Sequence, residues 1–152
     1  MKRFSGFVAL GLILAMASAC DSSKEFAKMT DRVAGYVSTG IDIAEKDLDK
    51  GSNAQVQTLV TLRAINTING ELITESKKYL SADGKKFALT GNGKQDLLKV
   101  LGSGQKTLQS LLGNEDFLKI EAGKRKAIER TINDLTETFA VMVELVDAVK
   151  TK

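Results

Sequence analysis

The amino-acid sequence predicts an all-α protein, an up-down-up-down four-helix bundle. The chain of 152 residues contains no Pro, so no residue in it forces a helix to end. Trp is absent and aromatic residues make up 5% of the chain, a composition that suits helix packing better than sheet packing. Four stretches carry apolar residues at steps of three and four, which is the period of a helix with one buried face.

The first two helices are expected over residues 22–49 and 53–80. Gly51 is suited to end the first helix, because glycine commonly follows the last helical residue. Only residues 50–53 join the two helices, so they must be antiparallel. Polar residues that can cap a helix precede both stripes: Asp21, Ser22 and Ser23 for the first, and Ser52 and Asn53 for the second.

The third helix is expected over residues 94–112, and Gly113 closes it. Gly102 and Gly104 lie at its centre, where each glycine costs about 1 kcal/mol relative to Ala. We therefore expect a kink or a division of the helix at these glycines, and a place for a groove.

The fourth helix is expected to begin at Asn114 and to continue to about Val149. Asn114 can cap it, and Glu115 and Asp116 suit the positive end of the helix dipole. Gly123 is the only internal weak point in this stretch.

Residues 81–93 interrupt the helical pattern. Asp83-Gly84 and Gly91-Asn92-Gly93 are both turn signals. Either a long loop or a short hairpin across Asp83-Gly84, with Tyr79 and Phe87 near its arms, fits this segment.

Residues 1–19 have the three parts of an export signal. Lys2 and Arg3 precede an apolar run over residues 7–16, and small residues follow it. The run is about half the length of roughly 20 apolar residues that a membrane span requires. We expect residues 1–19 to be removed and residues 20–152 to form one domain. Loss of Lys2 and Arg3 lowers the formal charge from +3 to +1.

Cys20, the only cysteine of the chain, follows the small residues Ala17-Ser18-Ala19. These four residues resemble the lipobox of bacterial lipoproteins, although Ala17 stands where Leu is usual. The resemblance implies a diacylglycerol on the Cys20 thiol and cleavage in front of it. Asp21 resembles the signal that retains lipoproteins of enteric bacteria in the inner membrane. The resemblance therefore implies a lipid-anchored location on the cell envelope, facing the periplasm or the exterior.

Ala17-Ser18-Ala19 also forms an A-x-A site for ordinary signal peptidase, which would release a soluble secreted protein that begins at Cys20. An uncleaved signal anchor is a third alternative. A secreted chain with one cysteine would carry an unpaired thiol into an oxidising compartment, whereas a lipoprotein needs one cysteine at the cleavage point. The cysteine count therefore favours lipidation of Cys20.

The residue types that are missing argue against an enzyme. The chain has no His, which removes the commonest general base and transition-metal ligand. With Cys20 committed to lipid, no thiol nucleophile or iron-sulfur ligand remains. We expect no catalytic residue, no cofactor and no metal site. A mature chain of nearly neutral charge also gives no reason to expect nucleic-acid binding.

Four short segments of the chain partly match known functional motifs. Two segments depart from the phosphate-binding loop. Gly91-Asn92-Gly93-Lys94 has Ala88 where the loop needs Gly and Gln95 where it needs Ser or Thr, and residues 102–107 have Gln105 inserted between Gly104 and Lys106. An acidic cluster near the end of the first helix is interleaved with lysines, so a solvated face fits it better than a cation site. A basic cluster is expected to form surface salt pairs, with contact to anionic lipid head groups as the alternative. The acidic cluster is Asp42, Glu45, Asp47 and Asp49, and the basic cluster is Lys124, Arg125 and Lys126.

The function expected is that of a non-enzymatic protein-binding or assembly factor, held to the membrane through Cys20. Helical lipoproteins of this size are similar in general form to the pilotins that guide secretin subunits. The groove for a partner protein is expected at Gly102 and Gly104 or under residues 81–93. The alternative is a small-ligand-binding or stress-response lipoprotein with an apolar cavity in the bundle.

Overall fold

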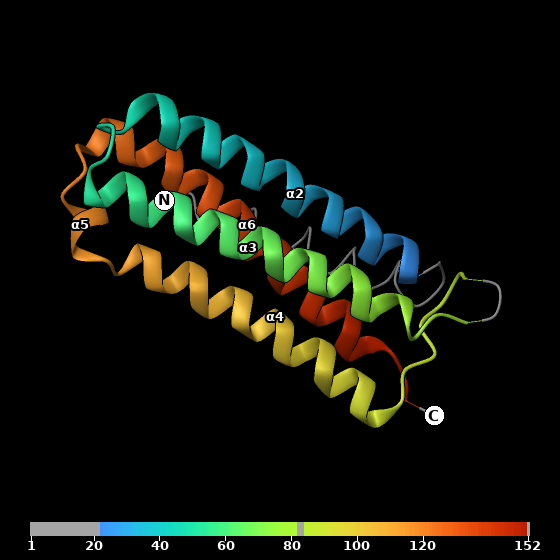
Figure 1. Cartoon of the computed structure of the whole chain (residues 1–152). Helices are drawn as coiled ribbons and strands as arrows, with labels where there is room; N and C mark the ends of the chain where they lie inside the picture. Colours follow the sequence, from blue (N-terminus) through green and yellow to red (C-terminus); the bar gives the residue numbers. More distant parts are fainter. Residues whose placement is uncertain (1–21, 82–83, 152) are drawn as a thin grey trace, which may run out of the picture.

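The computed structural model describes residues 22–81 and 84–151, and every regular element in these ranges is a helix. The all-α class is therefore confirmed. Figure 1 shows the long helices lying side by side, with a short helix at one end of the molecule. The helices are α2 (Ser22–Asp47), α3 (Asn53–Lys77), α4 (Gly91–Leu112), α5 (Glu115–Leu118) and α6 (Ala122–Ala148).

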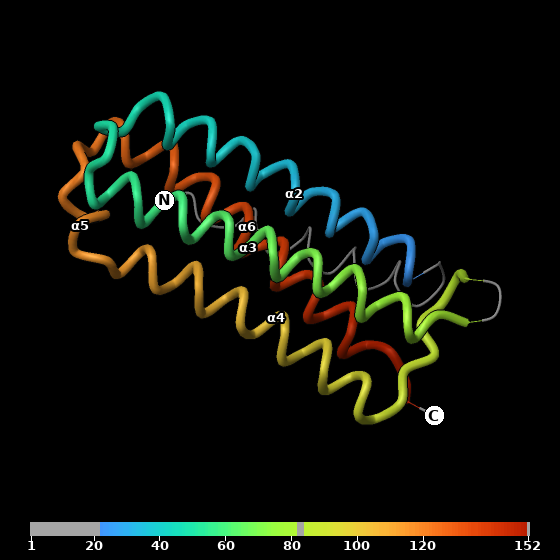
Figure 2. Tube along the Cα trace, in the orientation of Figure 1, coloured from blue at the N-terminus to red at the C-terminus, as the bar shows by residue number. Residues whose placement is uncertain are grey.

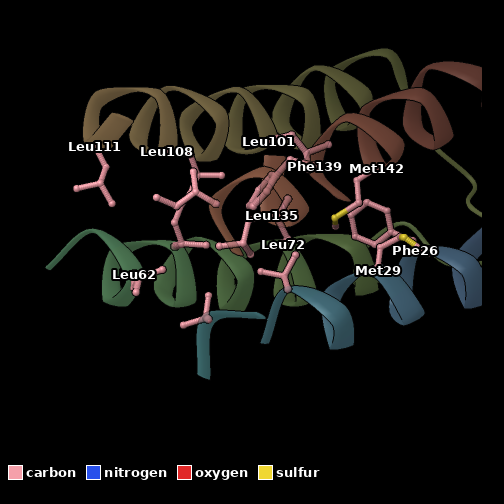
Figure 3. Close-up of a cluster of buried hydrophobic side chains, with 14 of the residues drawn as sticks. Phe26, Met29, Leu62, Leu72, Leu101, Leu108, Leu111, Leu135, Phe139 and Met142 are labelled. Atoms are coloured by element: carbon pink, nitrogen blue, oxygen red, sulfur yellow. The ribbon is translucent and has the colours of Figure 1, made fainter. Parts of the chain in front are cut away.

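The long helices pack in a ring. Helix α2 contacts α3 and α6, and α4 contacts the same two helices, so each long helix has two long neighbours. Figure 3 shows apolar side chains of all four long helices directed into the space between them. The largest fully buried side chains include Phe26, Leu62, Ile65, Leu72, Leu97, Leu101, Leu108, Ile128, Ile132 and Phe139.

The turn between α2 and α3 confirms two predictions from the sequence. Gly51 has φ +76°, a left-handed conformation that glycine adopts without strain. The Ser52 hydroxyl caps α3 by accepting a hydrogen bond from the Gln55 amide. The buried Gln55 side chain accepts from the Gly51 amide at 2.8 Å and donates to the Ala44 carbonyl at 3.1 Å. Gln55 therefore ties the end of α2 to the start of α3.

The segment after α3 forms a minimal hairpin. Leu80 and Phe87 make an isolated antiparallel bridge. The Ser81 amide donates to the Lys86 carbonyl at 2.8 Å, and the Ala88 amide donates to the Tyr79 carbonyl at 2.7 Å. Of the two structures that the sequence left open, the hairpin is present, with Tyr79 and Phe87 in its arms.

Helix α4 begins at Gly91, three residues before the predicted start. Thr90 is the cap, and its hydroxyl accepts a hydrogen bond from the Gly93 amide at 3.1 Å. The prediction that Gly91-Asn92-Gly93 forms a turn was wrong, because the Thr90 cap starts the helix ahead of these glycines.

Helix α4 runs through Gly102 and Gly104 as one helix, as its trace in Figure 2 shows, so the expected division there was wrong. Gly104 is buried, and a Cβ atom built on it would lie 2.7 Å from Cζ of Phe139. Close packing on Phe139 of α6 offsets the cost of this glycine in a helix. Gly102 has no atom near the position of such a Cβ.

The predicted fourth helix is wrong, because the structure has two helices in its place, α5 and α6. Asn114 is the expected cap, and its Oδ1 accepts hydrogen bonds from the amides of Asp116 and Phe117. Helix α5 ends after one turn, with Phe117 fully buried. Residues 119–121 separate α5 from α6, and Ile120 is the one large apolar residue of the stretch 119–126, so no apolar stripe continues from α5 into α6.

No helix within residues 22–81 and 84–151 combines the length and apolarity that crossing a bilayer requires.

Candidate functional site: the groove between α3 and α4

The predicted lipidation site Cys20 and the predicted sorting residue Asp21 lie outside the described residues. The first described residue, Ser22, opens α2. The Ser22 hydroxyl accepts a hydrogen bond from the Phe87 amide at 3.3 Å, and the Ser23 hydroxyl donates to the Gly84 carbonyl at 2.9 Å. The start of α2 is thus attached to the hairpin.

Four segments meet at this end of the molecule, which we call the basal end: residues 22–28, 75–81, 84–94 and 147–151. Figure 1 shows the start of α2, the hairpin, the start of α4 and the end of α6 together at one end. The Lys94 ammonium donates to the Asp147 carbonyl at 2.6 Å and joins α4 to α6. A small depression of about 230 Å³ opens beside Phe26 and Phe87, whose rings pack edge to face at 5.3 Å.

An open groove of about 940 Å³ lies between α3 and α4. Gly70 contributes no side chain to the α3 wall, and the groove is open beside it, since nothing lies within 4 Å of where its Cβ would be. Apolar surface comes mainly from Tyr79 and Val100, which are both partly buried. The residues that line the groove are Thr67, Gly70, Glu71, Thr74, Glu75, Lys78 and Tyr79, together with Asp96, Lys99, Val100 and Ser103 of α4.

The polar groups of the groove suit binding better than bond-breaking chemistry. Lys78 and Glu75 form an ion pair at 2.5 Å, and this hydrogen bond raises the pKa of the Lys78 ammonium above its usual 10.5. The Lys78 ammonium is therefore charged at neutral pH. A groove with carboxylates, ammonium groups, hydroxyls and a small apolar area can hold a peptide segment by ion pairs and hydrogen bonds.

The predicted groove residues do not line this groove. Gly104 points into the core against Phe139, and Gly102 is half-buried between the lining residues Val100 and Ser103. The glycine that opens the groove is Gly70 of α3, which the sequence analysis did not single out. The sequence does contain a signal for Gly70, because helical spacing places it on one face of α3 with the polar residues Thr67, Glu71 and Thr74.

The two charged clusters lie at the other end of the molecule. The acidic residues Asp42, Glu45, Asp47 and Asp49 are exposed, as expected for a solvated face. Across residues 22–81 and 84–151, no three or more Cys, Asp or Glu side chains form a group that could hold a metal ion.

Lys124 and Arg125 of the basic cluster form surface salt pairs, as predicted for the cluster. Arg125 pairs with Glu129 at 3.0 Å, and Lys124 pairs with Asp49 of α2 at 3.6 Å. The second pair places the start of α6 beside the end of α2, at the opposite end from Ser22. A second open depression, of about 370 Å³, lies there between the α2–α3 turn and residues 116–124.

The three cavities described above are open to solvent, and the space between the long helices is filled by the buried side chains.

No protein-family model matches the chain, and the comparisons with curated proteins and with solved structures find no significant match.

Proposed function

We propose that this protein is a lipoprotein of the bacterial cell envelope that acts as a non-enzymatic protein-binding or assembly factor. Its form is an up-down-up-down four-helix bundle tethered by lipid on Cys20, with residues 1–19 removed. The observation that carries the proposal is the sequence Ala17-Ser18-Ala19-Cys20 placed directly before the first helix. The ring of contacts among α2, α3, α4 and α6 supports the bundle.

The tether is short. Cys20 is separated from the start of α2 by Asp21 alone, and two residues span at most roughly 7 Å. A protein that reaches far across an envelope needs a long flexible linker, which this chain does not have between Cys20 and α2. The bundle is therefore held flush against the membrane surface.

The anchor is tested by Cys20→Ala in a bacterium that exports the chain. We expect the wild-type chain in the membrane fraction and the variant in the soluble fraction, because the lipid supplies the membrane attachment. Membrane association that is unchanged in the variant would contradict the anchor and favour an uncleaved signal.

The groove between α3 and α4 is the proposed site for a segment of the partner protein. It is the largest of the three cavities, and the mixed charges and hydroxyl groups of its lining suit a peptide. Gly70 and Gly35 make a matched pair for testing it. Each lies within a helix and has open space around the position of its Cβ, but only Gly70 lines the groove.

A photo-crosslinking residue at Ser103 should capture the partner in cells, whereas the same residue at the exposed Ser38 of α2 should not. Gly70→Arg fills the groove and should reduce the Ser103 adduct at least about tenfold, the change expected from about 1.4 kcal/mol of lost binding. Gly35→Arg should leave the adduct unchanged. Equal adducts from Ser103 and Ser38, or equal effects of the two substitutions, would refute the groove as the site.

A further inference from the structure

The basal end carries a large excess of positive charge. Within the described residues of its four segments there are eight lysines and three carboxylates, a formal charge of +5. The three carboxylates already lie in ion pairs, Glu25 with Lys28, Glu75 with Lys78 and Asp147 with Lys94. The side chains of Lys77, Lys86 and Lys150 are exposed at this end, as are those of Lys24 and Lys85, which have interaction partners of their own.

The excess is confined to this end. The opposite end, which we call the distal end, comprises residues 42–54 and 109–126 and holds six basic and seven acidic side chains, a formal charge of −1. All other described residues together carry −2. The molecule is thus electrically polarised along its length, although its total charge is small.

The basal end is also the end from which the chain leads back to Cys20. The distance from Ser22 to Cys20 is at most roughly 7 Å, which is less than the screening length of about 8 Å at physiological salt. Charges at the basal end therefore lie within electrostatic range of whatever surface holds the lipid. Phosphodiester head groups of anionic lipids attract lysines at about 1 kcal/mol each.

We propose that the basal end is a docking surface for the anionic lipid bilayer, so that the bundle stands on the membrane with the basal lysines against the head groups. The proposal rests on the proposed function, because the lipid on Cys20 identifies the end that meets the membrane. It relocates the lipid contact considered for Lys124, Arg125 and Lys126, which lie at the distal end, where Lys124 and Arg125 face carboxylates. The groove between α3 and α4 then runs along the side of the upright bundle, from Glu75, Lys78 and Tyr79 at the basal end to Thr67 and Ser103, where a partner can reach it.

The test uses the cell-processed protein, purified and reconstituted in vesicles of phosphatidylcholine alone or of phosphatidylcholine with phosphatidylglycerol. An amine-reactive reagent labels lysines, and mass spectrometry reports the labelling rate at each position. We expect labelling of Lys77, Lys86 and Lys150 to fall about fivefold in the anionic vesicles, the factor that corresponds to about 1 kcal/mol per lysine. Salt at about 1 M, where the screening length is about 3 Å, should restore it. The distal residues Lys46, Lys50 and Lys126 should label equally in both vesicles.

Two matched sets of substitutions identify the charges responsible. The basal set consists of Lys77→Gln, Lys86→Gln and Lys150→Gln. It lowers the formal charge of the described basal residues from +5 to +2 and should abolish the lipid-dependent protection of Lys85. The distal set consists of Lys46→Gln, Lys50→Gln and Lys126→Gln. It removes the same number of positive charges from exposed positions at the distal end and should leave the protection of Lys85 intact. Circular dichroism shows whether both sets keep the wild-type helix content.

Equal labelling of the basal lysines in both kinds of vesicle, or protection of the distal lysines instead, would overturn the docking surface. If the lipid anchor is absent, the N-terminal peptide carries no lipid and the protein does not associate with phosphatidylcholine vesicles. In that case, salt-sensitive protection of the basal lysines on anionic vesicles would still support the docking surface, and absence of this protection would refute the docking surface.

Discussion

At the scale of single residues, the contrast between Gly102 and Gly104 shows what the sequence could and could not convey. Both glycines were predicted as weak points of one helix, with a groove or kink beside them. Gly104 instead gives room to the Phe139 ring in the core, whereas Gly102 meets nothing. Helical spacing alone does not distinguish these roles, because the distinction depends on which side chain of a neighbouring helix lies opposite.

Replacing each glycine with alanine should therefore have opposite effects on stability. Gly104→Ala forces the Phe139 ring to shift within a packed core and should lower the free energy of unfolding by about 1–3 kcal/mol. Gly102→Ala should raise it by about 0.5–1 kcal/mol, because alanine favours the helix and meets no neighbour. Denaturant unfolding followed by circular dichroism measures both. Stabilisation by Gly104→Ala would contradict the close packing.

At the scale of elements, helices α2 and α3 could be predicted because their caps and apolar stripes agree. Ser52 and Gly51 acted as expected, and the observed ends lie within three residues of the predicted ones. The start of α6 was missed because the cap at Asn114 is genuine but starts a helix of only four residues. In addition, α6 begins at Ala122 without a side-chain cap, so no sequence signal marked it.

The α2–α3 turn depends on Gln55, which is 7% exposed and bridges Gly51 and Ala44. Gln55→Ala removes the hydrogen-bond partner of the Ala44 carbonyl and of the Gly51 amide. It should therefore lower the free energy of unfolding by about 1–3 kcal/mol. Gln57→Ala, on the exposed face of the same helix, should change stability by no more than about 0.5 kcal/mol. Equal midpoints in urea for the two variants would show that the bridge does not stabilise the turn.

At the scale of the whole molecule, the feature hidden from the sequence is the separation of charge. The lysines of the basal end come from four segments that are far apart along the chain, and the packing of the long helices brings them together. The total charge near neutrality therefore gave no indication of a surface whose described residues carry a formal charge of +5. The groove was hidden for the same reason, since its two walls belong to different helices.

The central claim, that the chain is held to a membrane by lipid on Cys20, is tested most directly by the mass of its N-terminal peptide. The protein is extracted from the membranes of a bacterium that processes it and digested, and the peptide that contains Cys20 is identified. The account predicts a peptide that begins at Cys20 and carries the mass of a lipid. A peptide that begins at Cys20 with an unmodified thiol, or one that still contains residues 1–19, would contradict it.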